Sequence, residues 1–497
     1  MAKLIKIKKG LNINLKGKPQ TIRKQTELSP EYTLFPGDFQ GFVPKLAVKQ
    51  NDQVQVGTPV MFDKNHPEIK IVSPVSGEVI SVNRGEKRIL LNIVIRTDNK
   101  KPGISEVNHE VVSKVICDVI TRVGDRNNAP DCFLLRTSQF AMTKTGVFDT
   151  SSLSPQVIKS ILAEAGIMVF IRQRPYDIIA NPKDTPRDIF VTGFYSTPLA
   201  PDLDFILEDQ EEDFQTGLDA LAAVTSGKVY LGISNTTRNV CLQNARNVEI
   251  VTFEGPHPAG NAGIQANHIR PVSKGEIIWT IDPAHVLFIG RFFNKGIIDF
   301  SRWVALTGSE VKPEERAYYS MLPGTCIEEW IKNRTESAYE HLRFISGNVL
   351  TGTSITSGGS LHAYDNQLTV IPEGDQTHEF LGWITPGFNK FSVNRSFPSF
   401  FTNLFSKKEY TIDSRIKGGR RAMIMSNEWD KVFPMDILPE YLIRAILTLD
   451  VEKMENLGIY EVAPEDFALC EFADTSKMEL QAIVRKGLDW LWGEMRE

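Results

Sequence analysis

One glycine-rich loop and the histidine inside it stand out as residues that could bind a ligand. The loop reads EGPHPAGNAG at 254–263 and directly follows the apolar run Val248 to Phe253. Loops at the carboxyl ends of parallel strands are where open α/β sheets bind their ligands. His257 could titrate near neutral pH. Because two prolines remove backbone N–H groups that a phosphate would use, a loop shaped for contact with a partner fits this sequence at least as well as a ligand site.

The sequence lacks the motifs that hold common redox cofactors and metals. It contains neither the G-x-G-x-x-G fingerprint of dinucleotide sites nor the P-loop. The eight histidines show no H-x-x-x-H or H-E-x-x-H spacing, and no Ser, Cys or carboxylate is placed as a catalytic companion of His257. The cysteines are dispersed and form no C-x-x-C pair; they are Cys117, Cys132, Cys241, Cys326 and Cys470. We therefore predict no catalytic residue and no metal site in this chain, and we expect buried free thiols in a reducing compartment.

The composition is that of a multidomain globular protein. The chain has 497 residues, a net charge of −5 and 41% hydrophobic residues. At ~150 residues per domain, this length predicts about three domains. The slightly acidic balance excludes a generally basic nucleic-acid binder. No apolar run approaches the ~20 residues of a membrane span, and the charged N-terminus lacks the apolar core of a signal peptide.

Two stretches carry charge of one sign. Residues 1–26 hold eight basic and no acidic side chains, whereas residues 201–220 hold eight acidic and no basic ones. Both could be solvated surfaces. The alternative for the basic arm, with Lys6, Lys8 and Lys9, is that it helps to dock the chain on a partner or on an anionic membrane surface.

The N-terminal quarter predicts a small barrel or sandwich. Residues 41–97 contain short alternating strands separated by turns at Gly57 and Gly77. The landmarks GTPV at 57–60 and SPVSGEV at 73–79 resemble those of biotinyl/lipoyl carrier domains, which present a modified lysine between them. Lys64 lies in that interval, but the carrier motif around the lysine is missing. The resemblance therefore supports the fold and not the swinging-arm function.

Strands and helices alternate over residues ~129–255. Ser154 and Pro155 are typical of a helix start, and an apolar face then continues to Gly166. Strand-like runs follow at 167–171, 189–192, 229–233 and 248–253, with one amphipathic helix expected between Phe205 and Val224. This order predicts parallel pairing with right-handed crossovers, which is a Rossmann-like layer.

The remaining chain predicts a β-grasp module and a helical end. We expect a multidomain α/β protein, α+β overall, in five parts. These are an N-terminal arm with a biotinyl/lipoyl-like barrel-sandwich domain (1–100), a Rossmann-like domain (101–298), a β-grasp, SLBB-like domain (299–350), a connecting β-rich segment (351–434) and a C-terminal helical domain without cluster cysteines (435–497).

Many short motifs, in order along the chain, carry a family resemblance. They include IKIKKGL at 5–11, RGEKR at 84–88, RQRP at 172–175, SGNVLTG at 346–352 and MDILP at 435–439, together with TPLA at 197–200 and the loop EGPHPAG. With these motifs, the chain resembles the NqrA family, which comprises the A subunits of the bacterial Na+-translocating NADH:quinone oxidoreductases. The resemblance runs from residue ~4 to ~490.

The resemblance implies a peripheral protein on the cytoplasmic face of the bacterial inner membrane. It implies partners among the other subunits, especially the membrane-embedded B subunit, in a complex that oxidises NADH, reduces ubiquinone and exports Na+. Flavins and the iron–sulfur centre are expected in those other subunits, with no cofactor bound by this chain. Related flavin-bearing subunits of respiratory complex I carry a glycine-rich flavin loop and cluster cysteines, and both are missing here; Cys470 stands without a neighbouring cysteine.

The family has been linked to quinone binding by this subunit, and two stretches are candidates for that site. The first is the apolar-aromatic stretch with Leu34, Phe35, Phe39 and Phe42, which could supply the walls of a pocket. The second is the glycine loop, with Gly255, His257, Gly260 and Gly263, in which His257 could donate a hydrogen bond. The remaining alternatives are a role in assembly alone and a stand-alone flavin- or nucleotide-dependent oxidoreductase.

Overall fold

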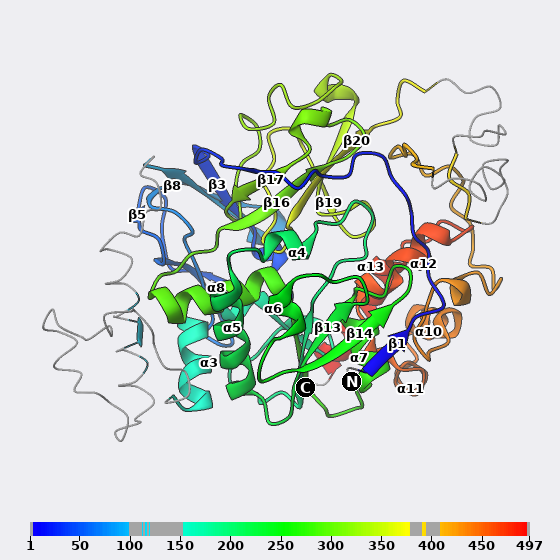
Figure 1. Cartoon of the computed structure of the whole chain (residues 1–497), viewed down its shortest axis with the longest axis horizontal. Helices are drawn as coiled ribbons and strands as arrows, with labels where there is room; N and C mark the ends of the chain where they lie inside the picture. The colour runs from blue at the N-terminus through cyan, green and yellow to red at the C-terminus, as the bar shows by residue number, and fades with distance from the viewer. Residues whose placement is uncertain are drawn as a thin grey trace, which may run out of the picture.

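The computed structural model describes residues 3–98, 153–377, 390–393 and 408–494, together with four helical positions between 112 and 119. The described residues form four sheets and a C-terminal group of helices. Figure 1 shows the barrel region with β3, β5 and β8 at the upper left and the sheet with β16 to β20 at the top, above the central layer with β13 and β14. The C-terminal helices lie to the right of that layer. Among the described residues, no helix is long and apolar enough to cross a membrane.

The central layer is a seven-stranded sheet in the order β1-β14-β13-β12-β15-β10-β11. Its first five strands are parallel, and β10 and β11 at the other end are antiparallel to their neighbours. The strands are β1 (Lys3–Lys6), β14 (Glu249–Glu254), β13 (Val229–Ser234), β12 (Asp188–Thr192), β15 (Ile278–Ile281), β10 (Ile171–Arg174) and β11 (Ile178–Ile179). The predicted Rossmann-like alternation is therefore present.

Both faces of this sheet are covered, which explains its almost uninterrupted apolar strands. Ile189 and Val191 of β12 pack against one face's helices, while Phe190 between them belongs to the core on the opposite face. The first face carries α3 (Pro155–Glu164), α5 (Glu211–Val224) and α8 (Pro283–Lys295), and the second carries α7 (Ala262–Ile269) and the C-terminal helices. The predicted start of α3 is confirmed, because the Ser154 hydroxyl accepts from the Val157 N–H.

The chain reverses its direction across the sheet between β12 and β15. From β12 it moves outward through β13 to β14, and it then returns to place β15 on the other side of β12. At such a switch point the loops leave the sheet in opposite directions and open a crevice at the carboxyl ends of the strands. A ligand site in this sheet is therefore expected beyond Thr192 and Ile281.

The N-terminal barrel-sandwich consists of two small sheets. One has the order β3-β9-β8-β5 and the other β4-β6-β7. Their strands are β3 (Glu31–Leu34), β9 (Leu90–Thr97), β8 (Gly77–Arg84), β5 (Gln53–Val54), β4 (Pro44–Leu46), β6 (Pro59–Asp63) and β7 (Lys70–Val72). Lys64 lies exposed in the turn between β6 and β7.

The β-grasp sheet is longer than its expected span. It has the order β19-β18-β20-β16-β17-β2. Its strands are β19 (Thr353–Ile355), β18 (Leu342–Ser346), β20 (Gln367–Pro372), β16 (Arg302–Thr307), β17 (Tyr318–Met321) and β2 (Arg23–Lys24). Because β20 lies between β18 and β16, the sheet continues past residue 350, where we placed the end of this module.

The C-terminal region is helical, as predicted. It contains α10 (Pro439–Leu447), α11 (Val451–Asn456), α12 (Ala468–Ala473) and α13 (Leu480–Glu494). The apolar face of α13 packs into a core that it shares with β14, α7 and the segment 7–15 that follows β1. Cys470 is fully buried in this core.

Three details of the sequence interpretation are corrected. The single helix expected between Phe205 and Val224 is two helices, α4 (Leu203–Ile206) and α5. The run 167–171 is mostly a 3-10 turn, because strand β10 begins only at its last residue. The interpretation of both charged stretches as solvated surfaces is corrected at Arg23, whose side chain is mostly buried and pairs with Glu208 and Asp209 of the acidic stretch. The two charged stretches thus partly neutralise each other. In the same arm, β1 joins the central sheet and β2 joins the β-grasp sheet. Docking of the arm on a partner stays a prediction.

Gly290 allows α5 and α8 to cross in contact. A Cβ at this position would overlap the carbonyl oxygen of Asp213 on α5. We expect Gly290→Ala to lower the free energy of unfolding by about 1–3 kcal/mol, because one helix must move away from the other. The matched control is Gly493→Ala on α13, where an added Cβ meets nothing within 4 Å. Thermal melting of both variants checks this, and equal melting temperatures would contradict the proposed close packing.

Candidate functional site

A polar cavity lies at the switch point of the central sheet. It is lined by Thr192 after β12, by Thr280 to Asp282 at the end of β15, and by the loop after β14. Loops of the β-grasp sheet, among them Tyr364 to Gln367, close it from above, and Glu465 of the C-terminal region closes one side. The cavity encloses about 220 Å³. That is roughly fifteen times the ~15 Å³ that one water needs, so a small molecule fits inside.

Among the described residues that line this cavity, His285 alone has buried side-chain polar atoms without a partner. It lies in the first turn of α8, which begins where the Asp282 side chain accepts from the Ala284 N–H. Its side chain is almost fully buried, and neither ring nitrogen has a hydrogen-bond partner within the described part of the chain. Burial holds its pKa well below the usual value, so the ring is neutral and carries one N–H donor. An orphaned buried polar group of this kind indicates a missing partner.

Aromatic rings surround His285. The centroid of Phe170 lies 4.7 Å from that of the imidazole, Phe288 lies at 5.3 Å and Tyr364 at 5.8 Å. These contacts fix the ring but cannot satisfy its nitrogens. The wall therefore offers apolar surface together with a positioned polar group, which is the usual composition of a small-molecule site.

A hydrogen-bonded chain lies beside the histidine. The Tyr195 hydroxyl donates to Asp282 Oδ1 at 2.8 Å, and the Asn366 amide donates to that hydroxyl at 2.7 Å. Burial raises the pKa of Asp282 to about 6. Since Oδ1 already accepts from Tyr195 and Ala284, Oδ2 is left to carry the proton.

A buried ion pair covers the start of α7, next to the cavity. Arg174 donates to Asp466 at 2.8 Å and to Glu465 at 3.0 Å, and both Arg174 and Asp466 are almost fully buried. A Cβ on Gly263 would overlap both the guanidinium and the Asp466 carboxylate. The first turn of α7 thus already faces protein carboxylates, at the place where a Rossmann-like sheet usually holds a ligand phosphate.

The structure brings two of the four predicted loop residues to the cavity. His257 and Gly260 line it, and the His257 Nδ1 lies 3.0 Å from the Ser196 hydroxyl. Burial lowers the pKa of His257 to about 4, so this ring is neutral as well. Gly255 instead packs against Ile7 with a φ of +156°, and Gly263 makes room for Arg174. These two glycines shape the loop and do not line the cavity.

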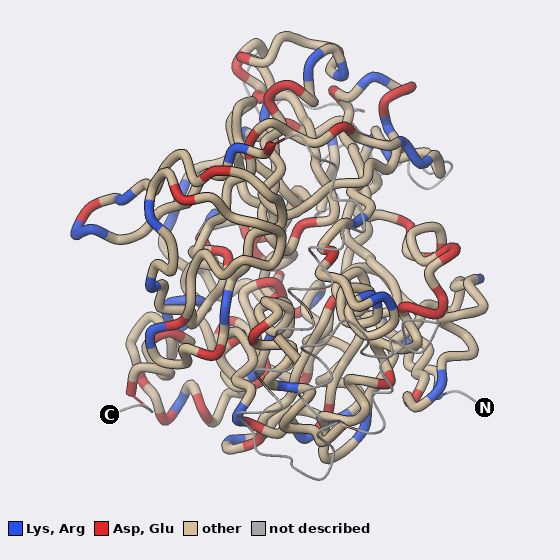
Figure 2. The backbone as a smooth tube through the Cα atoms, turned by 90° about the vertical axis from the view of Figure 1, so that its left-hand side faces the viewer, with Lys and Arg blue, Asp and Glu red and all other residues tan. Residues whose placement is uncertain are grey.

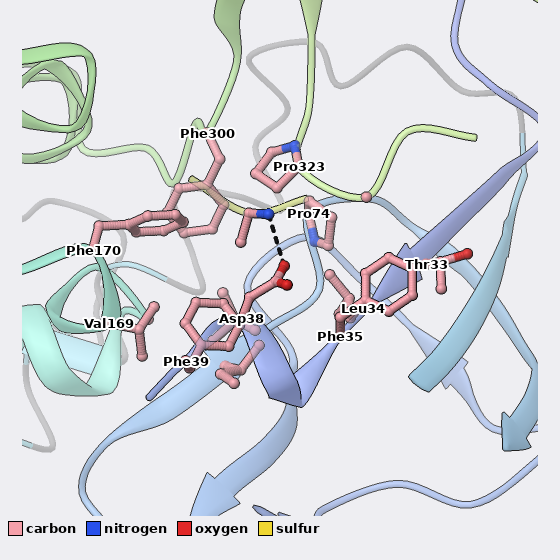
Figure 3. A pocket seen from close by; sticks show the side chains of 15 residues that line it. Thr33, Leu34, Phe35, Asp38, Phe39, Pro74, Val169, Phe170, Phe300 and Pro323 are labelled. Carbon is pink, nitrogen blue, oxygen red and sulfur yellow. Dashed lines mark hydrogen bonds between the residues drawn. The ribbon is translucent and has the colours of Figure 1, made fainter. Parts of the chain in front are cut away.

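The apolar-aromatic stretch lines a second, narrower cavity. Leu34, Phe35 and Phe39 form its walls with Val169 and Phe170, as Figure 3 shows. It encloses about 20 Å³, which is room for one water and not for a ring. Phe42 does not line it but packs on Phe39, with ring centroids 6.3 Å apart.

The two cavities are neighbours that share Phe170 as a wall. Tyr364 reinforces this partition, because its ring lies edge-on to both Phe39 and Phe170. Asp38 is the polar group of the narrow cavity, and it accepts from the Ala363 N–H at 2.8 Å and contacts His362 Nδ1 at 2.5 Å. Phe35 stacks on that histidine at 4.6 Å. The two stretches predicted as separate candidates therefore lie on either side of one aromatic partition.

Sequence reasoning missed the residues that contribute most to the large cavity. These are His285, Asp282 and Tyr195, which stand in no motif for ligand binding. The available signal was the buried strand Ile278–Ile281 followed by Asp282 and Pro283, which is a strand end joined to a helix cap. That signal becomes informative only when the strand is known to flank the switch point.

The described residues offer no metal site. No group of three or more His, Cys, Asp or Glu side chains among them could hold a metal ion. Cys241, Cys326 and Cys470 are free thiols, and Cys117 and Cys132 lie outside the residues whose side chains are described. The expected burial of the thiols is complete at Cys470, whereas Cys241 and Cys326 are half-buried.

Comparisons with known proteins identify three domains of one family. The NqrA N-terminal barrel-sandwich hybrid domain matches residues 5–98, the NqrA second alpha/beta domain matches 153–298, and the NQRA C-terminal domain matches 303–357. These matches confirm the predicted barrel-sandwich, α/β and SLBB-like modules. A solved NAD+-reducing nickel–iron hydrogenase aligns over 44% of this chain and 47% of its own, with a TM-score of 0.31 and 12% identity, a likeness too low to carry an argument.

Curated relatives match over nearly the whole chain. The A subunit of the Na+-translocating NADH-quinone reductase of Rhodopirellula baltica is 32% identical over 97% of both chains. Its counterparts in Neisseria meningitidis serogroup A and Vibrio vulnificus are 31% and 33% identical over 98% of this chain and 99% of theirs. The chain therefore belongs to the NqrA family, the A subunits of Na+-translocating NADH-quinone reductases.

Proposed function

We propose that this chain serves its NADH-quinone reductase complex by holding a quinone ring in the switch-point cavity. The observation that carries the proposal is His285, whose buried imidazole lines a cavity with neither nitrogen satisfied by the described residues. A quinone is planar and apolar, with carbonyl oxygens that only accept hydrogen bonds. The neutral His285 N–H supplies a donor, and Phe170 and Tyr364 supply aromatic walls.

The second donor is the protonated Asp282. Reduction of a quinone consumes two electrons and two protons, and a carboxyl with a pKa of about 6 can donate to a carbonyl oxygen while it remains protonated. Tyr195 and Asn366 hold this carboxyl in place through the hydrogen-bonded chain. The electrons come from redox groups outside this chain, which we place with the NADH site, the flavins and the iron–sulfur centre in the other subunits.

The narrow cavity extends the proposed site with apolar surface. Leu34, Phe35 and Phe39 lie directly behind Phe170, opposite the polar cavity. Because the narrow cavity has room for only one water, this proposal requires Phe170 and Tyr364 to move apart when the tail binds. The prenyl carbons are then buried against the side chains of the narrow cavity. In this arrangement both predicted stretches contribute. His257 and Gly260 lie at the ring, and the Phe39 group, which consists of Leu34, Phe35 and Phe39, lies at the tail.

The stand-alone flavin- or nucleotide-dependent enzyme is less well supported. Its ligand would bring a phosphate to the α7 N-terminus, where Asp466 and Glu465 already lie. Arg174 and the Asp466 carboxylate crowd Gly263 in the first turn of α7 so closely that a phosphate has no room there. We therefore propose that this chain is a peripheral component of the complex, located at the cytoplasmic face of the membrane. It works there with membrane-embedded partners, the B subunit foremost among them.

Replacing His285 tests the ring site directly. We expect a short-chain ubiquinone to bind the isolated chain, and His285→Leu to weaken binding about tenfold, because a lost hydrogen bond in a buried site is worth about 1.4 kcal/mol. His285→Gln keeps an N–H donor and should retain most of the affinity. His341→Leu, which lies in the β-grasp module outside the cavity, is the matched control. Calorimetric titration measures all four proteins, and unchanged affinity in His285→Leu would contradict the ring site.

The pH dependence of quinone binding tests Asp282. Its pKa is raised from 3.8 to about 6, so the carboxyl is protonated below that pH and loses its donor above it. Quinone affinity should therefore fall as the pH rises through about 6. Asp282→Asn keeps a donor at every pH and should flatten the profile. A wild-type profile that is already flat between about pH 5 and 8 would remove Asp282 from the site.

The Phe39 group can be tested by varying the tail of the ligand. Phe39→Leu should weaken binding of a prenylated quinone by roughly fivefold and leave a tail-less quinone within roughly twofold, because only the tail reaches this surface. Phe42→Leu damages the same aromatic cluster without lining the cavity, and it is the control. Equal losses for both ligands in Phe39→Leu would place the ring, and not the tail, beside Phe39.

A further inference from the structure

A basic segment without regular secondary structure crosses the outside of the C-terminal helices. We call this segment, residues 414–427, the basic strap. It contains Arg415, Lys417, Arg420 and Arg421 and no acidic residue. On the face that Figure 2 shows, by contrast, basic and acidic residues are interspersed. Within the strap itself all four charged side chains are basic, and Asp413 precedes it and Glu428 follows it.

The basic strap is held in place by the helices beneath it. The Arg421 N–H donates to the Ser476 carbonyl at 2.9 Å, and the Ser476 hydroxyl donates to the Ala422 carbonyl at 3.1 Å. At the end of the strap, the buried Glu440 carboxylate of α10 accepts from the Ser426 and Asn427 N–H groups. The strap thus presents its side chains from a fixed backbone.

Large apolar side chains of the strap and of α10 face solvent together. Ile424 is 54% exposed and Met425 39%, while Tyr441 on α10 is 52% exposed. The Arg444 guanidinium contacts the Met425 sulfur at 3.0 Å and so joins the strap to α10. Tyr441 and Arg444 are three residues apart and share one helix face. These side chains form one patch on the surface of the described chain.

Two guanidinium groups in this patch have no carboxylate partner among the described residues. Arg415 and Lys417 pair with Asp413, and Arg420 pairs with Glu479. Arg421 and Arg444 form no ion pair with any residue that the structure describes. Arg421 lies three positions before Ile424 in the strap, and Arg444 contacts Met425. Two such guanidiniums around an exposed apolar centre leave a surface that is complementary to carboxylates around an apolar side chain.

We propose that this patch, Arg421, Ile424, Met425, Tyr441 and Arg444, docks an acidic segment of another polypeptide in the complex. Arg, Met and Tyr are the residue types enriched at protein interfaces, where Lys is depleted. A lipid-binding cluster would instead depend on several Lys or Arg side chains that are free to reach headgroups, and here two of the strap's arginines and its lysine are paired within the chain. The partner is another subunit of the reductase, so this inference rests on the proposed function.

The test uses the intact complex purified through a tag on another subunit. Arg421→Glu with Arg444→Glu should lower the amount of this chain that is retained at about 0.15 M salt by roughly fivefold or more, because both contacts become repulsive. The matched control is Arg238→Glu with Arg246→Glu, which changes the charge equally at positions near α6 (Val240–Gln243). Melting temperatures of the isolated chains should be equal to the wild-type value for both variants.

Each outcome of this experiment is decisive. The proposal is supported if the variant with Arg421→Glu and Arg444→Glu is lost from the complex while the control variant is retained. Equal retention of both variants overturns it. Flotation with phosphatidylglycerol vesicles separates the lipid alternative: a strap variant that loses vesicle binding but remains stoichiometric in the complex would assign the patch to lipid and overturn the docking proposal. If even the wild-type chain fails to purify with the complex, the proposed function fails first, and the docking proposal that rests on it fails with it.

Discussion

The ion pair between Arg174 and Asp466 is the interaction on which the rest of the structure depends. It joins the last residue of β10 to the C-terminal helical region, and both side chains are almost fully buried. Removing one partner of such a pair leaves an uncompensated charge and costs several kcal/mol, typically ~3–5. Gly263 is required for this contact because any side chain there would overlap the two groups. With this pair in place, the sheet keeps the crevice of a nucleotide-binding fold but not its phosphate site.

The neighbouring modules decide the shape of this crevice. The β-grasp sheet supplies Tyr364 and Asn366, and the barrel-sandwich supplies Phe39 behind the shared Phe170 wall. The switch-point cavity thus lies where the α/β domain, the β-grasp sheet and the C-terminal region meet, with the barrel-sandwich behind Phe170, so no single module contains it. We propose that the polar cavity holds the quinone ring. The narrow cavity beyond Phe170 has room for one water, so it receives the tail only after Phe170 and Tyr364 move apart.

The sequence predicted the layers of this fold better than it predicted the site. Periodicity located α3, β12, β13 and β14. The buried residues of α3 recur at helical spacing, and those of the strands form short apolar runs, so both patterns are visible in the local sequence. It placed the loop with His257 at the carboxyl edge of the sheet, which is where that loop lies. His285 could not be predicted, because its importance comes from the lack of a partner among the described residues, which depends on how α8, β10 and the β-grasp loops pack together. The ion pairs of Arg23 could not be predicted for a similar reason, because a partner of this side chain lies almost two hundred positions away.

The most direct test of the central claim is photoaffinity labelling of the complex with a quinone that carries a photoreactive group on its ring, followed by peptide mapping of this chain. We expect label on the segments that enclose the switch-point cavity, around Tyr195, Asp282 to His285 and Tyr364. Excess unlabelled quinone should abolish this label. Competable label confined to the 34–42 stretch, or found only on other subunits, would contradict a quinone ring at His285.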